Sequence, residues 1–171
     1  MKSCSLMLLI ALAATPLGAG KNADSKATAA FEKLKSLAGE WEAHAQWDGK
    51  PVDQPVHMSY RVMSKGSSLV QVDHEENTAM VSVYHLDGDR LMLTHYCSAN
   101  NQPRLRAEPP QGEPRSLTFN FADITNLAGT DEGHMHKMVL TFEDNDHITQ
   151  EWTWKEGQKE YKAVFRFERK K

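Results

Sequence analysis

The stretch GEWEAHAQWDGK, residues 39–50, decides the fold class because its hydrophobic residues recur with a period of two. Apolar side chains alternate with polar ones from Trp41 to Trp47, which is typical of a β-strand that buries one face. Asp48-Gly49 follows immediately and is a turn signal of the kind that joins two antiparallel strands. This stretch therefore predicts the first strand of an antiparallel sheet.

The segment before this strand has a different period. Phe31, Leu34 and Leu37 recur at helical spacing within residues 28–38, and Gly39 then favours the end of a helix. Helical spacing occurs only here, so the sequence predicts one short N-terminal helix.

After residue 50, the period of two continues to the C-terminus. Further strands are predicted near residues 56–62, 68–75, 79–86, 90–97, 104–107, 117–123, 134–142, 148–154 and 161–167. Most of them are separated by tight turns, so successive strands pair as hairpins. A meander of this length closes on itself to remove its unpaired edges. We therefore expect an all-β, up-and-down antiparallel barrel of eight to ten strands, forming one domain over residues 28–171.

The composition is that of an ordinary globular protein. The 171 residues carry 20 Lys and Arg against 23 Asp and Glu, a formal charge of −3, with 40% hydrophobic residues. These values exclude a coiled coil, a collagen-like chain and a disordered chain. The absence of a basic excess argues against a nucleic-acid partner.

The N-terminus has the layout of a secretory signal peptide. Lys2 precedes an apolar run over residues 6–14, and the small residues Gly18, Ala19 and Gly20 follow. This run is shorter than the roughly 20 residues that span a bilayer, so we expect cleavage of residues 1–20, a flexible leader over 21–27, and no membrane span. The mature protein would be exported to the periplasm or the extracellular space. Cleavage removes Cys4, which leaves Cys97 without an internal disulfide partner.

Gly39-Glu40-Trp41, which follows a short helix and opens the first strand, resembles the start of barrels of the lipocalin and fatty-acid-binding (calycin) superfamily. The resemblance implies that Trp41 plugs the closed end of the barrel. It also implies that a basic residue near the end of the chain, Arg166 or Arg169, packs over this tryptophan.

The fuller sequence is similar to lipocalin-like domains of unknown function in exported bacterial proteins. The stretches that carry this similarity are residues 95–104 and 133–136. The chain departs from haem-binding barrels at Glu42-Ala43-His44, where those barrels continue with glycines. No ligand identity follows from the resemblance.

Alternation and strand direction together predict where the histidines lie. Side chains at i and i+2 share a face of a strand, and successive strands of a meander run in opposite directions. His95 and Cys97 have the parity of Leu93, whereas His134 and His136 have the parity of Met138. By the same reasoning, His74 has the parity of Val72. We therefore expect four imidazoles to point into the open half of the barrel.

The leading hypothesis is a non-enzymatic protein that binds a small hydrophobic or amphipathic molecule in the barrel. Apolar walls would supply affinity, and the predicted contacts are His74, His95, Cys97, Arg104, His134, His136, Trp152 and Trp154. The alternative is a metal or haem centre, which could be catalytic, with His95, His134 and His136 as metal ligands. The barrel would be a monomer or a dimer. Common motifs for nucleophilic, phosphate-binding or zinc-protease chemistry do not occur in the sequence.

Overall fold

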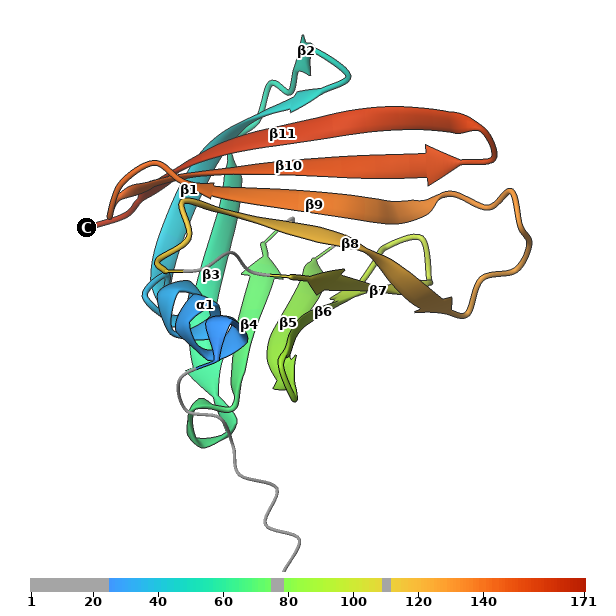
Figure 1. The fold of residues 1–171 in the computed structure, drawn as a ribbon. Helices are drawn as coiled ribbons and strands as arrows, with labels where there is room; N and C mark the ends of the chain where they lie inside the picture. Colours follow the sequence, from blue (N-terminus) through green and yellow to red (C-terminus); the bar gives the residue numbers. More distant parts are fainter. Residues whose placement is uncertain (1–24, 75–78, 109–111) are drawn as a thin grey trace, which may run out of the picture.

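A computed structural model describes residues 25–74, 79–108 and 112–171 (Figure 1). The predicted signal peptide and residues 21–24 of the leader lie outside the described residues. The regular elements are α1 (Lys26–Lys35), β1 (Gly39–Trp47), β2 (Lys50–Pro51), β3 (Val56–Met63), the 3₁₀-helix η1 (Ser64–Gly66), β4 (Ser68–Asp73), β5 (Met80–Asp87), β6 (Arg90–Tyr96), β7 (Gln102–Ala107), β8 (Ser116–Thr125), β9 (His134–Phe142), β10 (His147–Glu156) and β11 (Lys159–Arg169).

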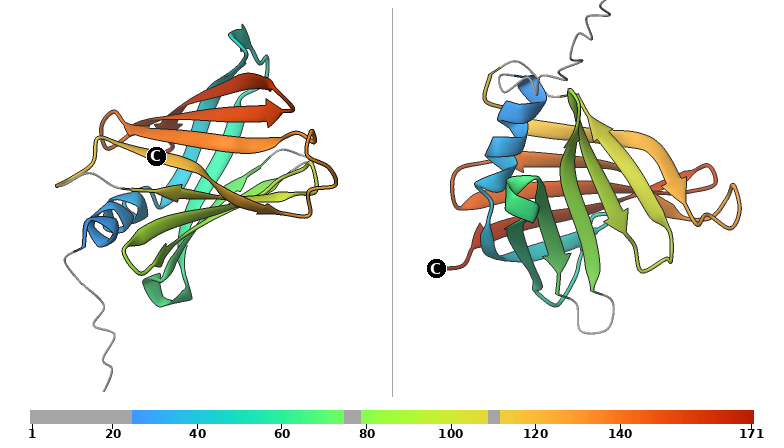
Figure 2. Two further views of the ribbon diagram at one scale, coloured as in Figure 1. Left: turned by 45° about the vertical axis from the view of Figure 1, so that its right-hand side comes forward. Right: turned by 90° about the horizontal axis from the view of Figure 1, so that it is seen from below.

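The strands form an antiparallel meander that closes into a barrel (Figures 1 and 2). From β3 to β11, each strand pairs with its neighbour in the sequence, while β1 pairs with both β3 and β11. Within the described residues ten strands close the barrel, and the short β2 extends β1 at one end. The predicted all-β, up-and-down architecture is confirmed, at the upper limit of the expected strand number. It is compatible with a calycin-like fold.

Helix α1 begins at Lys26, two residues earlier than the sequence pattern indicated. The side chain of Ser25 accepts a hydrogen bond from the Thr28 N–H at 3.2 Å, which caps the first turn. Phe31 and Leu34 are buried, and the helix packs against β3, β5 and β6. No helix in the described ranges has the length and hydropathy needed to cross a membrane.

Trp41 and Arg169 close one end of the barrel. The Arg169 guanidinium carbon lies 4.3 Å from the centroid of the Trp41 ring, and the indole Nε1 donates a hydrogen bond to the Leu37 carbonyl at 2.9 Å. Arg169 therefore takes the position that the family resemblance implied for one of two arginines. Arg166 instead is exposed on the outer face of β11.

The same arginine explains why a glycine precedes this tryptophan. Gly39 has a φ of +141°, and a Cβ atom there would lie 2.9 Å from Arg169 Nη1. That guanidinium also donates to the carbonyls of Ala38 and Ser36, each at 3.0 Å. The positive φ therefore favours glycine, and any larger residue would also displace the guanidinium.

The barrel interior is filled mostly by its own side chains. Fully buried aromatic residues include Tyr60, Tyr84 and Phe119, and the edge of Tyr84 meets Phe119 at a centroid separation of 5.7 Å. Other large, fully buried side chains include Trp41, Leu34, Met58, Leu69, Leu91, Leu93, Leu105, Leu117 and Met138. This core restricts open space to a small region, described below.

We predict that Arg169→Ala lowers the free energy of unfolding by about 2–3 kcal/mol, because it removes a cation–π contact and several charge-assisted hydrogen bonds. Urea denaturation followed by tryptophan fluorescence measures the change. Arg166→Ala on the same strand is the matched control, with an expected change below about 0.5 kcal/mol. Equal effects of the two substitutions would contradict the assigned role of Arg169.

Candidate functional site

A chain of hydrogen-bonded polar side chains crosses the barrel interior. Gln150 Nε2 donates to the Tyr60 hydroxyl at 2.6 Å and to Gln71 Oε1 at 3.2 Å, and Tyr84 donates to the same Gln71 oxygen at 2.7 Å. Trp152 Nε1 donates to Gln150 Oε1 at 2.9 Å. Burial raises the pKa of both tyrosines, so both hydroxyls stay protonated as donors. The network fixes Gln150 and Trp152 in the middle of the barrel.

His95 lies beside this network and is only 2% exposed. Its Nδ1 is 2.9 Å from the Ser82 hydroxyl, and its ring centroid is 5.0 Å from that of Trp152. Burial lowers the pKa of His95 to about 4, so the ring is neutral at neutral pH. Among the described residues, His95 Nε2 has no hydrogen-bond partner although it is buried. This atom is available to a molecule inside the barrel.

A small hollow adjoins His95 and Trp152. Its volume is about 30 Å³, roughly the space of one water molecule. Drug-sized ligands occupy pockets of about 300–1,000 Å³, so a cavity of that size is not preformed here. Seven strands contribute the lining residues, which are Val56, Asp73, Met80, His95, Met135, Gln150, Trp152, Phe165 and Phe167.

His134 and His136 lie together, but they do not line this hollow. His134 Nε2 is 3.2 Å from His136 Nδ1, and both rings contact Phe121, with centroid separations of 5.2 and 4.7 Å. The register between β9 and β10 shifts here, since Trp154 pairs with Met135 whereas Thr153 pairs with Lys137. This β-bulge leaves His136 unpaired and brings Met135 to the hollow, which simple alternation did not predict.

The predicted three-histidine metal site does not form in this geometry. His95 contacts Ser82 and Trp152, whereas His134 and His136 contact each other and Phe121. Over residues 25–74, 79–108 and 112–171, no group of three or more His, Cys, Asp or Glu side chains is placed to hold a metal ion. The bulge in β9 accounts for the separation.

Two other predicted contacts point away from the interior. His74 is exposed, and its Nε2 lies 2.9 Å from the Ser59 hydroxyl. The prediction followed the parity of Val70 and Val72, but Leu69 and Gln71 are the residues of β4 that face inward.

Arg104 also points away from the interior. It is exposed on β7, where it forms an ion pair with Asp123, and the buried side chains of this strand are those of Pro103, Leu105 and Ala107. The predicted contact of Arg104 with a ligand in the interior is therefore not supported by its position.

Cys97 and Trp154 lie at the open end, and both are half-buried. Cys97 is a free cysteine just after β6, and burial raises the pKa of its thiol. Trp154 lies against Gly133, where a Cβ atom would be 2.1 Å from the indole ring. The predicted positions of both residues near this end agree with the structure, although neither lines the hollow.

Sequence reasoning did not single out Asn101, Gln71 or Gln150. Asn101 is fully buried, and its Nδ2 donates to the Gly133 carbonyl at 2.9 Å, which ties the β6–β7 turn to the start of β9. Its Oδ1 is the other buried side-chain polar atom without a partner in the described part of the chain. Gln71 shares the parity of the buried Leu69, and Gln150 shares that of the buried Ile148 and Trp152. This shared parity could have predicted that both glutamines point inward.

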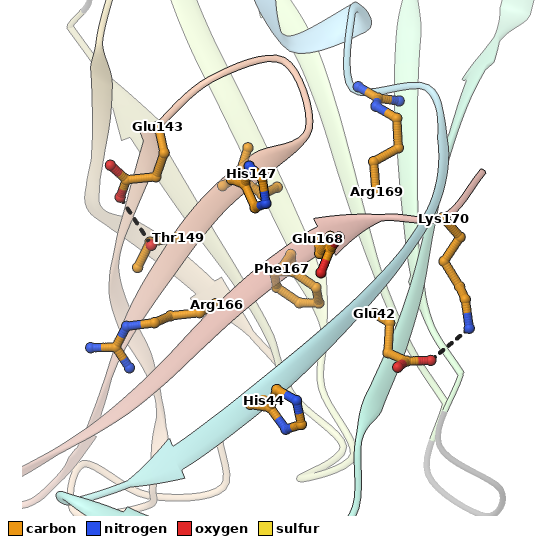
Figure 3. Close-up of a pocket in the computed structure, with 11 residues that line it drawn as sticks. Glu42, His44, Glu143, His147, Thr149, Arg166, Phe167, Glu168, Arg169 and Lys170 are labelled. Atoms are coloured by element: carbon orange, nitrogen blue, oxygen red, sulfur yellow. Dashed lines mark hydrogen bonds and ion pairs between the residues drawn. The ribbon is translucent and has the colours of Figure 1, made fainter.

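The larger concavity of the molecule is on the outer surface (Figure 3). This groove has a volume of about 490 Å³ and lies over β1, β10 and β11. Arg166 lies opposite His44 of β1 and Thr149 of β10. Glu42 and Lys170 pair at 2.6 Å, and Thr149 donates to Glu143 at 3.1 Å. Because none of the buried unpartnered atoms described above belongs to this groove, the open end of the barrel remains the stronger candidate site.

Comparison with models of protein families gives no match for this chain. Comparison with curated proteins gives no significant match either.

The depressed pKa of His95 predicts a pH-dependent stability. Between its ordinary value of 6.5 and its folded value of about 4, the unfolded chain binds a proton at His95 that the folded chain does not. Stability therefore falls as the pH falls through this window, by up to about 3 kcal/mol. We expect His95→Gln to remove this contribution, as measured by urea denaturation between about pH 7 and about pH 4.5.

His74→Gln is the control for this prediction, because His74 is exposed at the same end of the barrel. The control should keep the pH dependence of the unmodified protein. If the His95 variant and the unmodified protein lose stability in parallel on acidification, the proposed neutral state of His95 is wrong.

Proposed function

We propose that the protein binds a small molecule at the open end of the barrel, through the hollow beside His95 and Trp152. The observation that carries this proposal is the buried His95 Nε2 without a partner. A buried polar atom that makes no hydrogen bond costs about 1–3 kcal/mol. A ligand atom that bonds to this nitrogen would recover that free energy. A purely structural core would avoid the cost more simply, with an apolar side chain at position 95.

The walls of the hollow indicate what the ligand would be. Phe165, Met80 and Met135 are apolar and half-buried, whereas His95, Gln150 and Asp73 supply polar groups. Methionine side chains are flexible and adapt to the shape of a ligand, so movement of the two methionines would enlarge the hollow. The chemistry fits a small molecule with a flat or aliphatic body and one hydrogen-bonding group directed at His95.

Ligand binding predicts that the protein, purified without denaturation, carries a small organic molecule that native mass spectrometry detects. If no such molecule co-purifies, phenol is the probe, because it is a flat ring with one hydroxyl group. Phenol should change the tryptophan fluorescence, because Trp152 contacts His95. The substitution His95→Phe fills the hollow and removes the polar partner of phenol. It should therefore weaken phenol binding at least about tenfold.

The control for the phenol titration is His74→Gln, which should respond like the unmodified protein. A response that is the same in the His95→Phe variant would contradict the proposed site. Absence of both a co-purified molecule and a phenol response would favour the alternative that the barrel is a structural module filled by its own side chains. The small volume of the hollow favours that alternative.

We also propose that residues 1–20 direct export, as their charge and apolar run indicate. Expression of the full chain in a bacterium should then yield a processed protein in the periplasm or medium. Intact mass and N-terminal sequencing would locate the cleavage between about residues 19 and 23. Recovery of only unprocessed cytoplasmic protein would contradict export.

A further inference from the structure

We propose that His134 and His136 form a chelating pair for a late first-row divalent cation, with Cu(II) bound most tightly. This site is separate from the hollow at His95 and does not depend on the proposed ligand-binding function.

The separation of the two nitrogens fits bidentate binding. His134 Nε2 and His136 Nδ1 are 3.2 Å apart. With metal–nitrogen bonds of about 2.0–2.1 Å, this separation corresponds to an angle of about 100° at the metal. Such an angle lies between the octahedral and the tetrahedral values. The separation therefore matches that of two nitrogens bound to one ion.

A second observation concerns the orientation of His134. Its Nδ1 is 3.1 Å from the Glu132 carbonyl, which only accepts hydrogen bonds, so this nitrogen carries the proton. The lone pair is then on Nε2, the atom that faces His136. Metal-binding histidines usually donate their other N–H group to a carbonyl or carboxylate in this way. His134 is 8% exposed and is held in this tautomer by a backbone atom.

The proton on His136 follows from the same contact, because the lone pair of His134 Nε2 faces His136 Nδ1. In the metal-free protein, its Nδ1–H donates to His134 Nε2. When a metal binds, that proton moves to Nε2 through tautomer exchange, and Phe121 keeps the ring in place by stacking at 4.7 Å.

The number of ligands selects the class of cation. Zinc sites use three or four protein ligands, and no third His, Cys, Asp or Glu completes a group here among the described residues. Cu(II) and Ni(II) accept imidazole nitrogen together with water in tetragonal sites, and the Irving–Williams order places Cu(II) first. The remaining positions would take water or the polar group of an incoming molecule.

The experiment is a calorimetric titration of the full-length protein with CuCl₂, repeated with NiCl₂ because nickel does not oxidise Cys97. We expect the tightest binding event to belong to this pair, and His136→Gln and His134→Gln should each weaken it at least about tenfold. Electron paramagnetic resonance of the copper form should show hyperfine coupling to two nitrogens in the unmodified protein and to one in each variant. Circular dichroism confirms that each variant is folded.

The control variant is His147→Gln. His147 Nδ1 lies 2.9 Å from Asp144 Oδ1, so this exposed pair is another place where a cation could bind. The control should bind copper as the unmodified protein does. The proposal is overturned if His136→Gln binds copper unchanged, or if the loss follows His147→Gln instead. Phenol binding at His95 is measured separately, so failure of one proposal leaves the other intact.

Discussion

The contact between Arg169 and Trp41 is the constraint on which the closed barrel depends. Arg169 ends the last strand, and Trp41 lies near the start of the first, so their contact joins the two strands that must pair for closure. The guanidinium also donates to carbonyls after α1 and to the Asn145 carbonyl in the β9–β10 turn. One side chain thereby fixes the helix, the closing seam and a hairpin. Glycine at position 39 suits this arrangement because φ is positive there and a Cβ atom would displace the guanidinium.

The filled core leaves little open space inside the described part of the barrel. Large aromatic and aliphatic side chains occupy most of the interior, and the hollow beside His95 and Trp152 lies toward the open end. The polar network around Gln150 lies between the core and the hollow, where it holds Trp152 against His95. Satisfied hydrogen bonds make this network rigid. The one nitrogen that it leaves without a partner, His95 Nε2, is therefore held in a defined position rather than free to turn toward solvent.

The sequence was sufficient to predict the architecture because alternation and turn residues are local properties. Each predicted strand corresponds to an observed one, and the prediction of inward direction was right for His95. It is wrong for His74 because this residue shares the parity of Val70 and Val72, whereas Leu69 and Gln71 are the residues of β4 that face the core. A valine is no more apolar than a leucine, and the inward glutamine is stabilised by partners from distant strands. Such long-range hydrogen bonds leave no local pattern.

The remaining differences come from two β-bulges. The β7–β8 register shifts between Arg104 and Leu105, and the β9–β10 register shifts at Thr153 and Trp154. An extra residue in one strand changes the face to which the following side chains point. Beyond a bulge, alternation along the sequence therefore no longer predicts which side chains face inward. In β9, this brings Met135 to the hollow and leaves His136 beside His134.

These two bulges lie toward the same end of the barrel as Gly133, which lets the Trp154 ring lie against the backbone. The hydrogen bond from Asn101 to the Gly133 carbonyl then fixes the start of β9 to the β6–β7 turn. At the closed end, β1 and β11 pair without a register shift, which places Trp41 opposite Arg169. At the open end, the pairing of β8 and of β9 contains register shifts. At this irregular end, the buried imidazole of His95 contacts Trp152, whereas the imidazoles of His134 and His136 contact each other and Phe121. The same end of the barrel thus holds two chemically different groups of side chains.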